Sequence, residues 1–153
     1  MGKTVAQNRK AHHDYIIEDT LEAGIALTGT EIKSIRDGRV NLQDAYARIE
    51  RGEAWLVGAH VAPWTGGDRY NHEPKRDRKL LLHRTQIDQL AVKARAKGLT
   101  LVPLALYFND RGRAKVQLGL ARGKKSYDRR RDIAERDARR DMDREMADAA
   151  RGR

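Results

Sequence analysis

The chain has 153 residues, a length that suits one compact domain with an appendage and is short for two domains. It carries 32 lysines and arginines against 22 aspartates and glutamates, which gives a formal net charge of +10. Because the electric field of a strongly positive protein concentrates polyanions around it, nucleic acid is the expected partner. The sequence contains no cysteine, which excludes disulfides and thiolate metal sites and agrees with a reducing compartment.

The N-terminal residues and the apolar runs do not predict a membrane segment. The opening MGKTVAQNRKAHHD is polar almost throughout, unlike a signal peptide, and it lacks the Ser or Thr that a myristoylation signal has at its sixth position. The longest apolar run, GLTLVPLALYF, is too short to span a bilayer and contains Pro103. We therefore expect a soluble, cytoplasmic protein with no membrane partner.

The first structural signals in chain order are a strand and a short helix. Residues 15–18 are rich in β-forming side chains, which predicts a strand. Thr28 and Glu31 have the spacing of a capping box, and Gly38 suits the left-handed end of a helix. A short helix is therefore predicted between Thr28 and Gly38.

Residues 45–63 predict a β-hairpin. Its turn falls at residues 51–53, and apolar residues alternate along the second strand. Gly58 interrupts that strand. A glycine inside a strand often marks a bulge or the sharp bend of a barrel corner.

An amphipathic helix is predicted next, because apolar residues recur on one helical face after residue 85. Thr85 and Asp88 have the spacing of an N-terminal cap, and Gly98 suits the C-terminal end. This pattern predicts a helix that is capped at Thr85 and ends before Gly98.

A second hairpin is predicted over residues 102–120. Apolar residues alternate over 102–108 and again over 116–120, with the turn-like NDRG between them. Pro103 has no N–H to donate to a sheet. The first of these strands is therefore expected to lie at an edge or to carry a bulge.

Several short strands, glycine bends and few helices predict a mainly β fold, an OB-fold-like small β-barrel with flanking helices. An open antiparallel α+β sheet is the alternative. The barrel domain is expected to span residues 1–121, and residues 122–153 to form a basic hinge and a C-terminal tail.

The end of this tail has a different composition. Residues 132–153 contain six basic and seven acidic residues and only a narrow apolar stripe, which includes Met142 and Met146. Such a stripe holds a helix weakly. We therefore expect the tail to be disordered when free and helical once a partner covers it.

Three basic clusters favour an RNA-binding or DNA-binding surface. Residues 122–131 hold six cations and one acid around Tyr127, and this combination offers cations to phosphates and an aromatic ring to an unpaired base. The stretches PKRDRKLLLHR and QNRKAHH are weaker signals, because charge runs are often only solvated faces. Together the clusters predict a nucleic-acid surface.

Few residues offer catalytic chemistry. His12 and His13 beside Asp14 have the character of metal ligands or of a general base, but adjacent residues of a strand point to opposite faces, which disfavours joint ligation. Glu22 has two interpretations. It lies in a solvated turn, or its carboxylate accepts hydrogen bonds from the edge of a nucleic-acid base. An RNA-processing or RNA-modifying enzyme that uses His12, His13 or Glu22 is thus the alternative to a binding protein. No cofactor is predicted.

Four long stretches of the sequence, in order, resemble the bacterial SsrA-binding protein (SmpB) family. They are NRKAHHDYIIEDTLEAGIALTGTEIKSIRDGRVNLQDAYA, NHEPKRDRKLLLH, KGLTLVPLALYF and LGLARGKKSYDRRRD. The resemblance covers nearly the whole chain. It implies an OB-fold barrel that is not an enzyme and that binds the tRNA-like domain of transfer-messenger RNA.

The resemblance also implies a role in trans-translation, the rescue of ribosomes stalled on messages that lack a stop codon. In that family the C-terminal tail occupies the empty mRNA channel beyond the decoding centre of the small subunit. Elongation factor Tu and alanyl-tRNA synthetase are implied as indirect partners through the RNA. We expect the protein itself to be a monomer.

Matching positions assign expected contacts. The resemblance implies transfer-messenger RNA contacts at Asn8, Glu22, Leu81 and Lys115. The basic clusters extend the expected RNA-binding set to Lys10, Lys79, His83, Arg122, Lys124 and Lys125. Expected contacts of the tail with the ribosome and its decoding centre are Gly123, Tyr127, Asp128, Arg129, Arg130, Met142 and Met146.

Two positions depart from the family pattern. Arg129 stands where the family often has Lys, which preserves the charge. Glu145 and Met146 stand where some members have an Ile-Met pair, so the expected terminal contact of the tail differs from that of those members at Glu145.

Overall fold

The computed structural model describes residues 3–66 and 71–124, together with the single positions 136, 139, 140, 142 and 144. Its elements in chain order are β1 (Thr4–Gln7), α1 (Arg9–Asp14), β2 (Tyr15–Ile25), α2 (Gly29–Arg36), β3 (Val40–Asn41), β4 (Tyr46–Glu50), β5 (Glu53–Val57), β6 (His60–Val61), β7 (Arg78–Leu81), α3 (Arg84–Lys97), β8 (Thr100–Phe108) and β9 (Ala114–Gly123).

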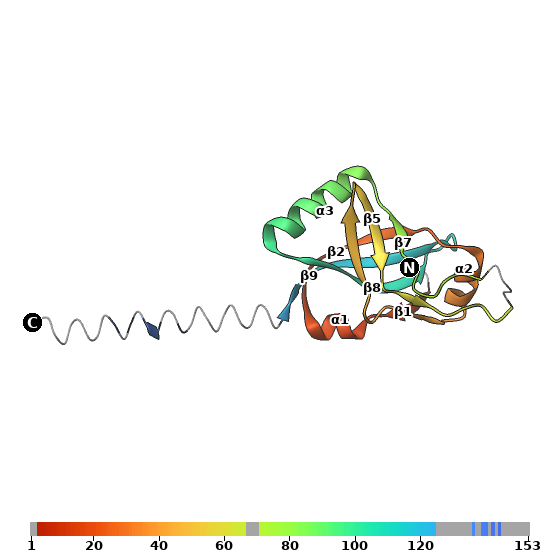
Figure 1. The fold of residues 1–153 in the computed structure, drawn as a ribbon, viewed down its shortest axis with the longest axis horizontal. Coiled ribbons are helices and arrows are strands. Elements are labelled where there is room, and N and C mark those ends of the chain that lie inside the picture. The colour runs from red at the N-terminus through yellow and green to blue at the C-terminus, as the bar shows by residue number, and fades with distance from the viewer. Residues whose placement is uncertain are drawn as a thin grey trace, which may run out of the picture.

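The large sheet closes into a barrel. Its seven strands run in the order β1-β8-β4-β5-β7-β2-β9, and β8 also pairs with β9, so six strands form a ring and β1 extends it beside β8. All of these pairings are antiparallel. The predicted small β-barrel with flanking helices is therefore confirmed, and the open sheet is excluded. In Figure 1, α3 lies above the barrel, α1 below it and α2 at one end.

The short helix forms as the sequence predicts, and the first hairpin forms from β4 and β5. Its second strand is shorter than predicted, since it ends at Val57 and residues 60–61 form β6, which pairs with β3. Thr28 and Glu31 make a reciprocal capping box at the start of α2. The turn between β4 and β5 has positive φ at both Arg51 and Gly52, 53° and 75°, as a tight hairpin turn requires. Gly58 also has positive φ, 83°, and a Cβ there would lie 3.1 Å from the Asp44 carbonyl oxygen.

The start of α3 differs from the prediction. The helix begins at Arg84, and its N-cap is His83, whose backbone N–H donates to the Gln86 side chain at 3.0 Å. The predicted cap at Thr85 is wrong because a glutamine three residues after His83 satisfies the free backbone donor instead. The predicted end is confirmed, since Gly98 has a φ of 63°.

Pro103 produces a bulge rather than an edge. The pairing of β8 with β9 shifts register between Pro103 and Ala105, which leaves Leu104 as the extra residue. The shift reverses which residues face inward: Leu106 packs inside the barrel, whereas Leu104 joins a separate cluster with Ala11 of α1. The bulge expected in this strand is therefore confirmed, but the single apolar face predicted over residues 102–108 is wrong, because the faces exchange at the bulge. The bulge gives α1 its docking face.

The N-terminal residues form more structure than the sequence indicates. β1 pairs with β8, and α1 covers the outer face of β8 and β9 through Ala11, Val102, Leu104 and Ala121. His12 and His13 therefore lie on a helix. The prediction that their side chains point to opposite faces assumed a strand and is wrong in that assumption.

The last strand of the barrel, β9, ends at Gly123. The division into a barrel domain of residues 1–121 and a hinge and tail of residues 122–153 stays a prediction. The predicted disorder of the tail concerns residues that lie almost entirely outside those that the structure describes. Within the described residues, no helix has the length and apolar character needed to span a membrane.

Candidate RNA-binding surface

One groove gathers half of the predicted RNA-binding residues. It has a volume of about 670 Å³ and opens between β2, β7, β9, the turn after β4 and the start of α3. We call it the Leu81 groove, and the predicted residues that line it are Glu22, Lys79, Leu81, His83 and Lys115.

The strand registers bring these residues together from distant parts of the sequence. Gly24 of β2 pairs with Leu81 of β7 on one side and with Lys115 of β9 on the other. Gly24 has no side chain to fill the space, and a Cβ there would lie 3.1 Å from the Leu81 Cβ. The glycine therefore leaves room for Leu81 in the wall of the groove.

Leu81 is an exposed apolar side chain among charged ones. Along β7, Arg78 and Leu80 point into the protein, whereas Lys79 and Leu81 point outward. The Leu81 side chain is 53% exposed, while Leu80 is 1% exposed. An exposed leucine flanked by lysines fits contact with the apolar face of a base or sugar.

Glu22 lies on β2, and its side chain is held by a tyrosine from β8, the strand on the other side of β9. The Tyr107 hydroxyl of β8 donates a hydrogen bond to a Glu22 carboxylate oxygen. Partial burial and this hydrogen bond raise the pKa of Tyr107 to about 12, so the tyrosine stays a donor. The alternative that placed Glu22 in a solvated turn is wrong; the carboxylate is oriented, and its remaining lone pairs can accept from a ligand.

The cations of the groove differ in their freedom. Lys79 is paired with Glu53, its Nζ 3.3 Å from the carboxylate, with both side chains nearly half exposed. Lys115 has no ion-pair partner among the residues that the structure describes. Lys115 is therefore the cation best placed to bind a phosphate.

A second group of predicted residues lies at the opposite end of the β2–β9 ladder. Gly123 pairs with Tyr15, whereas Lys115 pairs with Gly24, eight residues earlier on β9. At about 3.3 Å a residue, roughly 26 Å separates the two ends. The members at the far end are Lys10, Arg122, Gly123 and Lys124.

The cations of this second group are partly neutralised. Lys10 lies 2.8 Å from Asp44, and that hydrogen bond raises the pKa of Lys10. Arg122 lies 2.8 Å from Glu18. Lys124 donates from Nζ to the backbone oxygen of His12 at 3.4 Å, which ties the end of β9 to α1. The predicted RNA-binding residues thus form two separate groups rather than one patch.

Asn8 belongs to neither group, because its side chain is used inside the protein. Its amide nitrogen donates to the carbonyl oxygens of Leu42 at 3.0 Å and Pro103 at 2.9 Å, and its oxygen accepts from the N–H of Ala11 at 3.1 Å. Asn8 is only 3% exposed. Its side chain caps α1 and fixes it to the barrel, so direct contact with RNA would require breaking these bonds.

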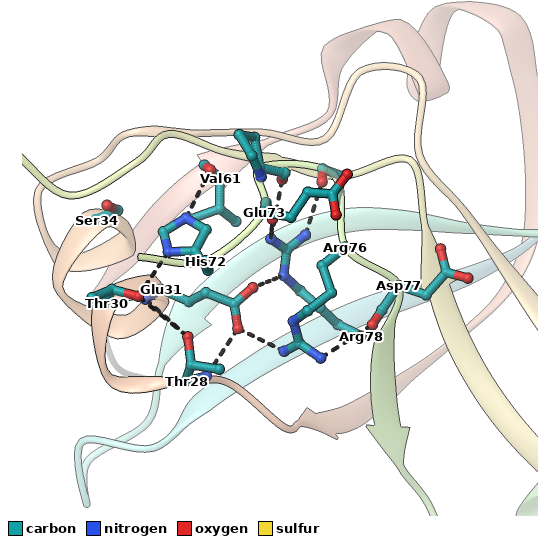
Figure 2. Close-up of polar contacts among 12 residues, drawn as sticks. Thr28, Thr30, Glu31, Ser34, Val61, His72, Glu73, Arg76, Asp77 and Arg78 are labelled. Carbon is teal, nitrogen blue, oxygen red and sulfur yellow. Dashed lines mark hydrogen bonds and ion pairs between the residues drawn. The ribbon is translucent and has the colours of Figure 1, made fainter. Parts of the chain in front are cut away.

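Part of the basic stretch PKRDRKLLLHR is also structural. Figure 2 shows the Glu31 carboxylate between two guanidinium groups, those of Arg76 and Arg78. Arg78 is fully buried and also donates to the Ala59 carbonyl at 2.8 Å and to the Pro74 carbonyl at 3.1 Å. The expectation that this whole stretch is a solvated or RNA-binding cluster is therefore wrong for Arg76 and Arg78.

The carboxylate in this network is strongly stabilised in its charged form. Burial alone would raise the pKa of Glu31, but hydrogen bonds from Arg76, the Thr28 N–H and Arg78 lower it to about 2. His72 extends the network, with Nε2 2.9 Å from the Val61 carbonyl oxygen and Nδ1 2.9 Å from the Thr30 hydroxyl (Figure 2). The network fastens α2 to the loop before β7.

The residues of the alternative enzyme do not converge. His13 contacts Asp14 at 2.9 Å on the exposed end of α1. Glu22 lies seven residues along β2 from Tyr15, roughly 23 Å at the rise of a strand. Among the described residues, no group of His, Asp or Glu is placed to hold a metal ion.

Several predicted contacts fall beyond what the structure describes. These are Lys125, Tyr127, Asp128, Arg129, Arg130 and Met146. Met142 is described as a single helical position whose side chain is 59% exposed.

Sequence reasoning missed Tyr107, which orients Glu22, and Arg36, which lies 5.7 Å from the centre of the Phe108 ring. Alternation along β8 could have placed Tyr107 on the outer face beside Lys115, its partner on β9. The proximity of Arg36 to Phe108 depends on how α2 packs against the barrel, which no local pattern reveals.

The chain is similar in sequence to known proteins over most of its length. The family model described as SmpB protein matches residues 5–148. An SsrA-binding protein of Desulforamulus reducens is 60% identical over 144 residues, covering 94% of this chain and 89% of the relative. One from Moorella thermoacetica is 58% identical and covers 94% of this chain and 93% of its own.

A solved structure described as "tmRNA-SmpB: a journey to the center of the bacterial ribosome" contains a similar chain. The two chains are 55% identical and superpose with a TM-score of 0.66, over 78% of this chain and 83% of the other. The family match spans both the barrel and most of the residues that follow it. The chain therefore belongs to the SmpB protein family.

Proposed function

We propose that the protein binds the tRNA-like domain of transfer-messenger RNA through the Leu81 groove and delivers this RNA to stalled ribosomes in trans-translation. The observation that carries the proposal is the composition of the groove, in which an oriented carboxylate, an exposed leucine and a lysine line one hollow. That lysine, Lys115, has no ion-pair partner among the described residues. The relatives are named SsrA-binding proteins, and the similar solved chain is described with tmRNA and the ribosome.

Each side chain suits a different part of an RNA. Lys115 and Lys79 attract phosphates, and Leu81 offers apolar contact to a base or a ribose. Glu22 repels phosphates but accepts hydrogen bonds from the amino and imino groups of a base edge. A carboxylate held by Tyr107 inside a basic groove therefore favours one register of a folded RNA over others.

Gly123 and the tail residues beyond it suit a different partner. On this proposal the barrel holds the RNA, and the C-terminal tail enters the ribosome, with Gly123, Tyr127, Asp128, Arg129, Arg130, Met142 and Met146 toward the decoding centre and the mRNA channel. The near-neutral charge of residues 132–153, six basic against seven acidic, supports this division because such a segment gains little from phosphates.

This family consists of RNA-binding proteins and not of enzymes. The RNA-processing alternative is therefore set aside, in agreement with the positions of His13 at the end of α1 and of Glu22 seven residues along β2 from Tyr15. We further propose that the protein acts in the cytoplasm as a monomer, and that elongation factor Tu and alanyl-tRNA synthetase meet it through the RNA.

The proposal is tested by purifying the tagged protein from a cell lysate and sequencing the RNA that accompanies it. Transfer-messenger RNA should dominate the recovered RNA. A variant with Lys79→Gln and Lys115→Gln should recover much less of it, whereas Lys93→Gln with Lys97→Gln, an equal charge change on α3, should recover as much as the unchanged protein. Recovery of unrelated RNAs, or equal losses in both variants, would overturn the proposal.

A further inference from the structure

A second hollow adjoins the Leu81 groove. It has a volume of about 340 Å³, and Gly24, Leu81 and Lys115 line both spaces. The exposed Leu81 thus stands between two neighbouring hollows on one face of the barrel. The second space, which we call the Phe108 hollow, is completed by Leu27, Ile32, Arg36, Phe108 and Arg113.

The floor of the Phe108 hollow is apolar and aromatic. Leu27 and Phe108 are partly buried and pack against the core of the barrel. Phe108 is the only phenylalanine of the chain, and it lies at the end of β8 instead of inside the core. The Arg36 guanidinium lies above its ring, 5.7 Å from the centroid. A flat cation over a flat ring forms a stacking surface.

The rim of the hollow is cationic. Arg36, Arg113 and Lys115 line it, and none of the lining residues within the described part of the chain is acidic. The Leu81 groove, in contrast, contains Glu22 and Glu53. The Phe108 hollow is therefore the more uniformly positive of the two spaces.

The turn that carries Arg113 is braced by its own hydrogen bonds. The Asn109 side-chain oxygen accepts from the backbone N–H of Arg111 at 3.0 Å and from that of Arg113 at 2.9 Å. The Asn109 N–H donates to the Arg113 carbonyl at 2.9 Å. The backbone of Arg113 is thus fixed at the rim before any ligand arrives.

We propose that the Phe108 hollow takes an unpaired nucleobase of the same RNA that occupies the Leu81 groove. The base stacks against Phe108 and Arg36, and the flanking phosphates contact Arg113 and Lys115. The inference rests on the proposed function, because the shared wall at Leu81 and Lys115 continues the RNA surface. The volume lies at the lower end of the range for small-ligand pockets, which suits one base.

The charge and shape of the hollow favour RNA over a protein partner. An acidic peptide would satisfy the three cations but would not need an aromatic floor with a stacked guanidinium. An apolar peptide would use the floor but would bury the cations. An unpaired nucleotide uses both, because it combines a flat ring with a phosphate.

The test is the affinity of the full chain for the tRNA-like domain of transfer-messenger RNA at a fixed salt concentration. Loss of base stacking is worth about 1–3 kcal/mol, so Phe108→Leu and Arg36→Gln should each weaken binding by about five- to a hundredfold. Arg113→Gln should weaken it about threefold or more, as expected for one phosphate contact. Arg111→Gln is the matched control, because it removes the same charge from the same turn without touching the hollow, and it should leave affinity unchanged.

Ultraviolet crosslinking of the complex, followed by mass spectrometry, identifies the occupant. A nucleotide crosslinked to Phe108 in the unchanged protein supports the inference. Equal effects of Arg113→Gln and Arg111→Gln, together with no crosslink at Phe108, would overturn it. So would a crosslink from Phe108 to a ribosomal protein in the ribosome-bound complex.

The same titration separates this inference from the proposed function. If Glu22→Gln and Lys115→Gln weaken binding while the Arg36 and Phe108 variants do not, the Leu81 groove binds the RNA and the Phe108 hollow does not. If none of these variants changes affinity, the proposed function fails as well. Because Arg36 is exposed, its result does not depend on whether Phe108→Leu disturbs folding.

Discussion

At the scale of single residues, Glu31 is a buried carboxylate on which the packing of α2 depends. It is fully buried and contacts Arg76 and Arg78, both of which also contact backbone carbonyls of the loop before β7. A buried carboxylate with two guanidinium partners is costly to break, because the remaining charges lose their compensation. The network therefore makes the position of α2 dependent on one ionised side chain.

The pH dependence of stability follows from the lowered pKa of Glu31. Its pKa is about 2 in the folded protein against a usual value of 4.5, so its contribution is fully present above pH 4.5 and is lost as the pH falls toward 2. A difference of this size corresponds to about 3 kcal/mol. Denaturant titrations between pH 6 and pH 2.5 should show this loss in the unchanged protein and not in Glu31→Gln.

The Glu31→Gln variant should itself lose about 3–5 kcal/mol of stability at pH 7. Glu50→Gln is the control, since Glu50 makes a half-exposed pair with Arg48 at 3.2 Å, and such surface pairs contribute less than about 1 kcal/mol. Equal losses in the two variants would contradict the role assigned to the buried network.

Tyr107 gives a test of how Glu22 is oriented. Replacing it with Phe removes the hydroxyl that donates to the Glu22 carboxylate while keeping the ring. The affinity for transfer-messenger RNA should fall by about three- to tenfold, since one hydrogen bond to a charged group contributes about 1 kcal/mol or more. In a Glu22→Gln background the same Tyr107→Phe change should have a smaller effect. Additive losses would show that the two residues act independently.

At the scale of elements, local patterns predict what local interactions decide. The capping box of α2 and the turn at Arg51 and Gly52 are set by a few neighbouring residues, and both were predictable. The bulge at Pro103 was also expected, but its consequence for the rest of β8 was not. Which face of the strand points inward after a bulge depends on the register with β9, a contact between distant residues.

The helix α1 was missed for a related reason. It has only six residues and no strong helical pattern, and it forms because Asn8 caps it and Ala11 docks on the surface that the bulge exposes. Short helices are held by tertiary contacts more than by propensity. The same limit applies to the candidate RNA-binding residues. Their residue types were predictable, but their separation into two groups depends on the β2–β9 register.

Asn8 tests whether α1 is held by its cap. Asn8→Ala removes the cap and leaves the carbonyls of Leu42 and Pro103 without their donor, so stability should fall by about 2–4 kcal/mol. Asn8→Asp keeps the capping oxygen and should lose less. At a temperature where both variants are folded, their RNA affinity should be close to that of the unchanged protein. A large loss of affinity in a fully folded Asn8 variant would instead show direct contact with the RNA.

At the scale of the whole molecule, the proposed RNA-binding groove and the start of the C-terminal tail lie at opposite ends of the β2–β9 ladder. The Leu81 groove lies at one end, and Lys124 contacts α1 at the other. In Figure 1, β9 ends beside α1. Roughly 26 Å of barrel separates the proposed RNA-binding residues of the groove from the start of the tail, at about 3.3 Å a residue. One small domain can therefore hold an RNA while its C-terminal segment reaches a second partner.

Removing residues 132–153 should separate these tasks. The deleted segment has a net charge of −1, six basic minus seven acidic, so affinity for transfer-messenger RNA should change by no more than about twofold. Peptide tagging on stalled ribosomes should be abolished in a reconstituted translation reaction. Loss of RNA affinity in this variant, or normal tagging, would contradict the division.

The central claim, that the Leu81 groove binds the RNA, is tested most directly by one pair of substitutions measured in one titration. Leu81 and Val92 are both exposed apolar residues, 53% and 67%, but only Leu81 lines the groove. Leu81→Asp places a carboxylate against phosphates and should weaken binding of the tRNA-like domain at least about tenfold. Val92→Asp adds the same charge on α3 and should leave the affinity within about twofold. Equal affinities for the two variants would contradict the account.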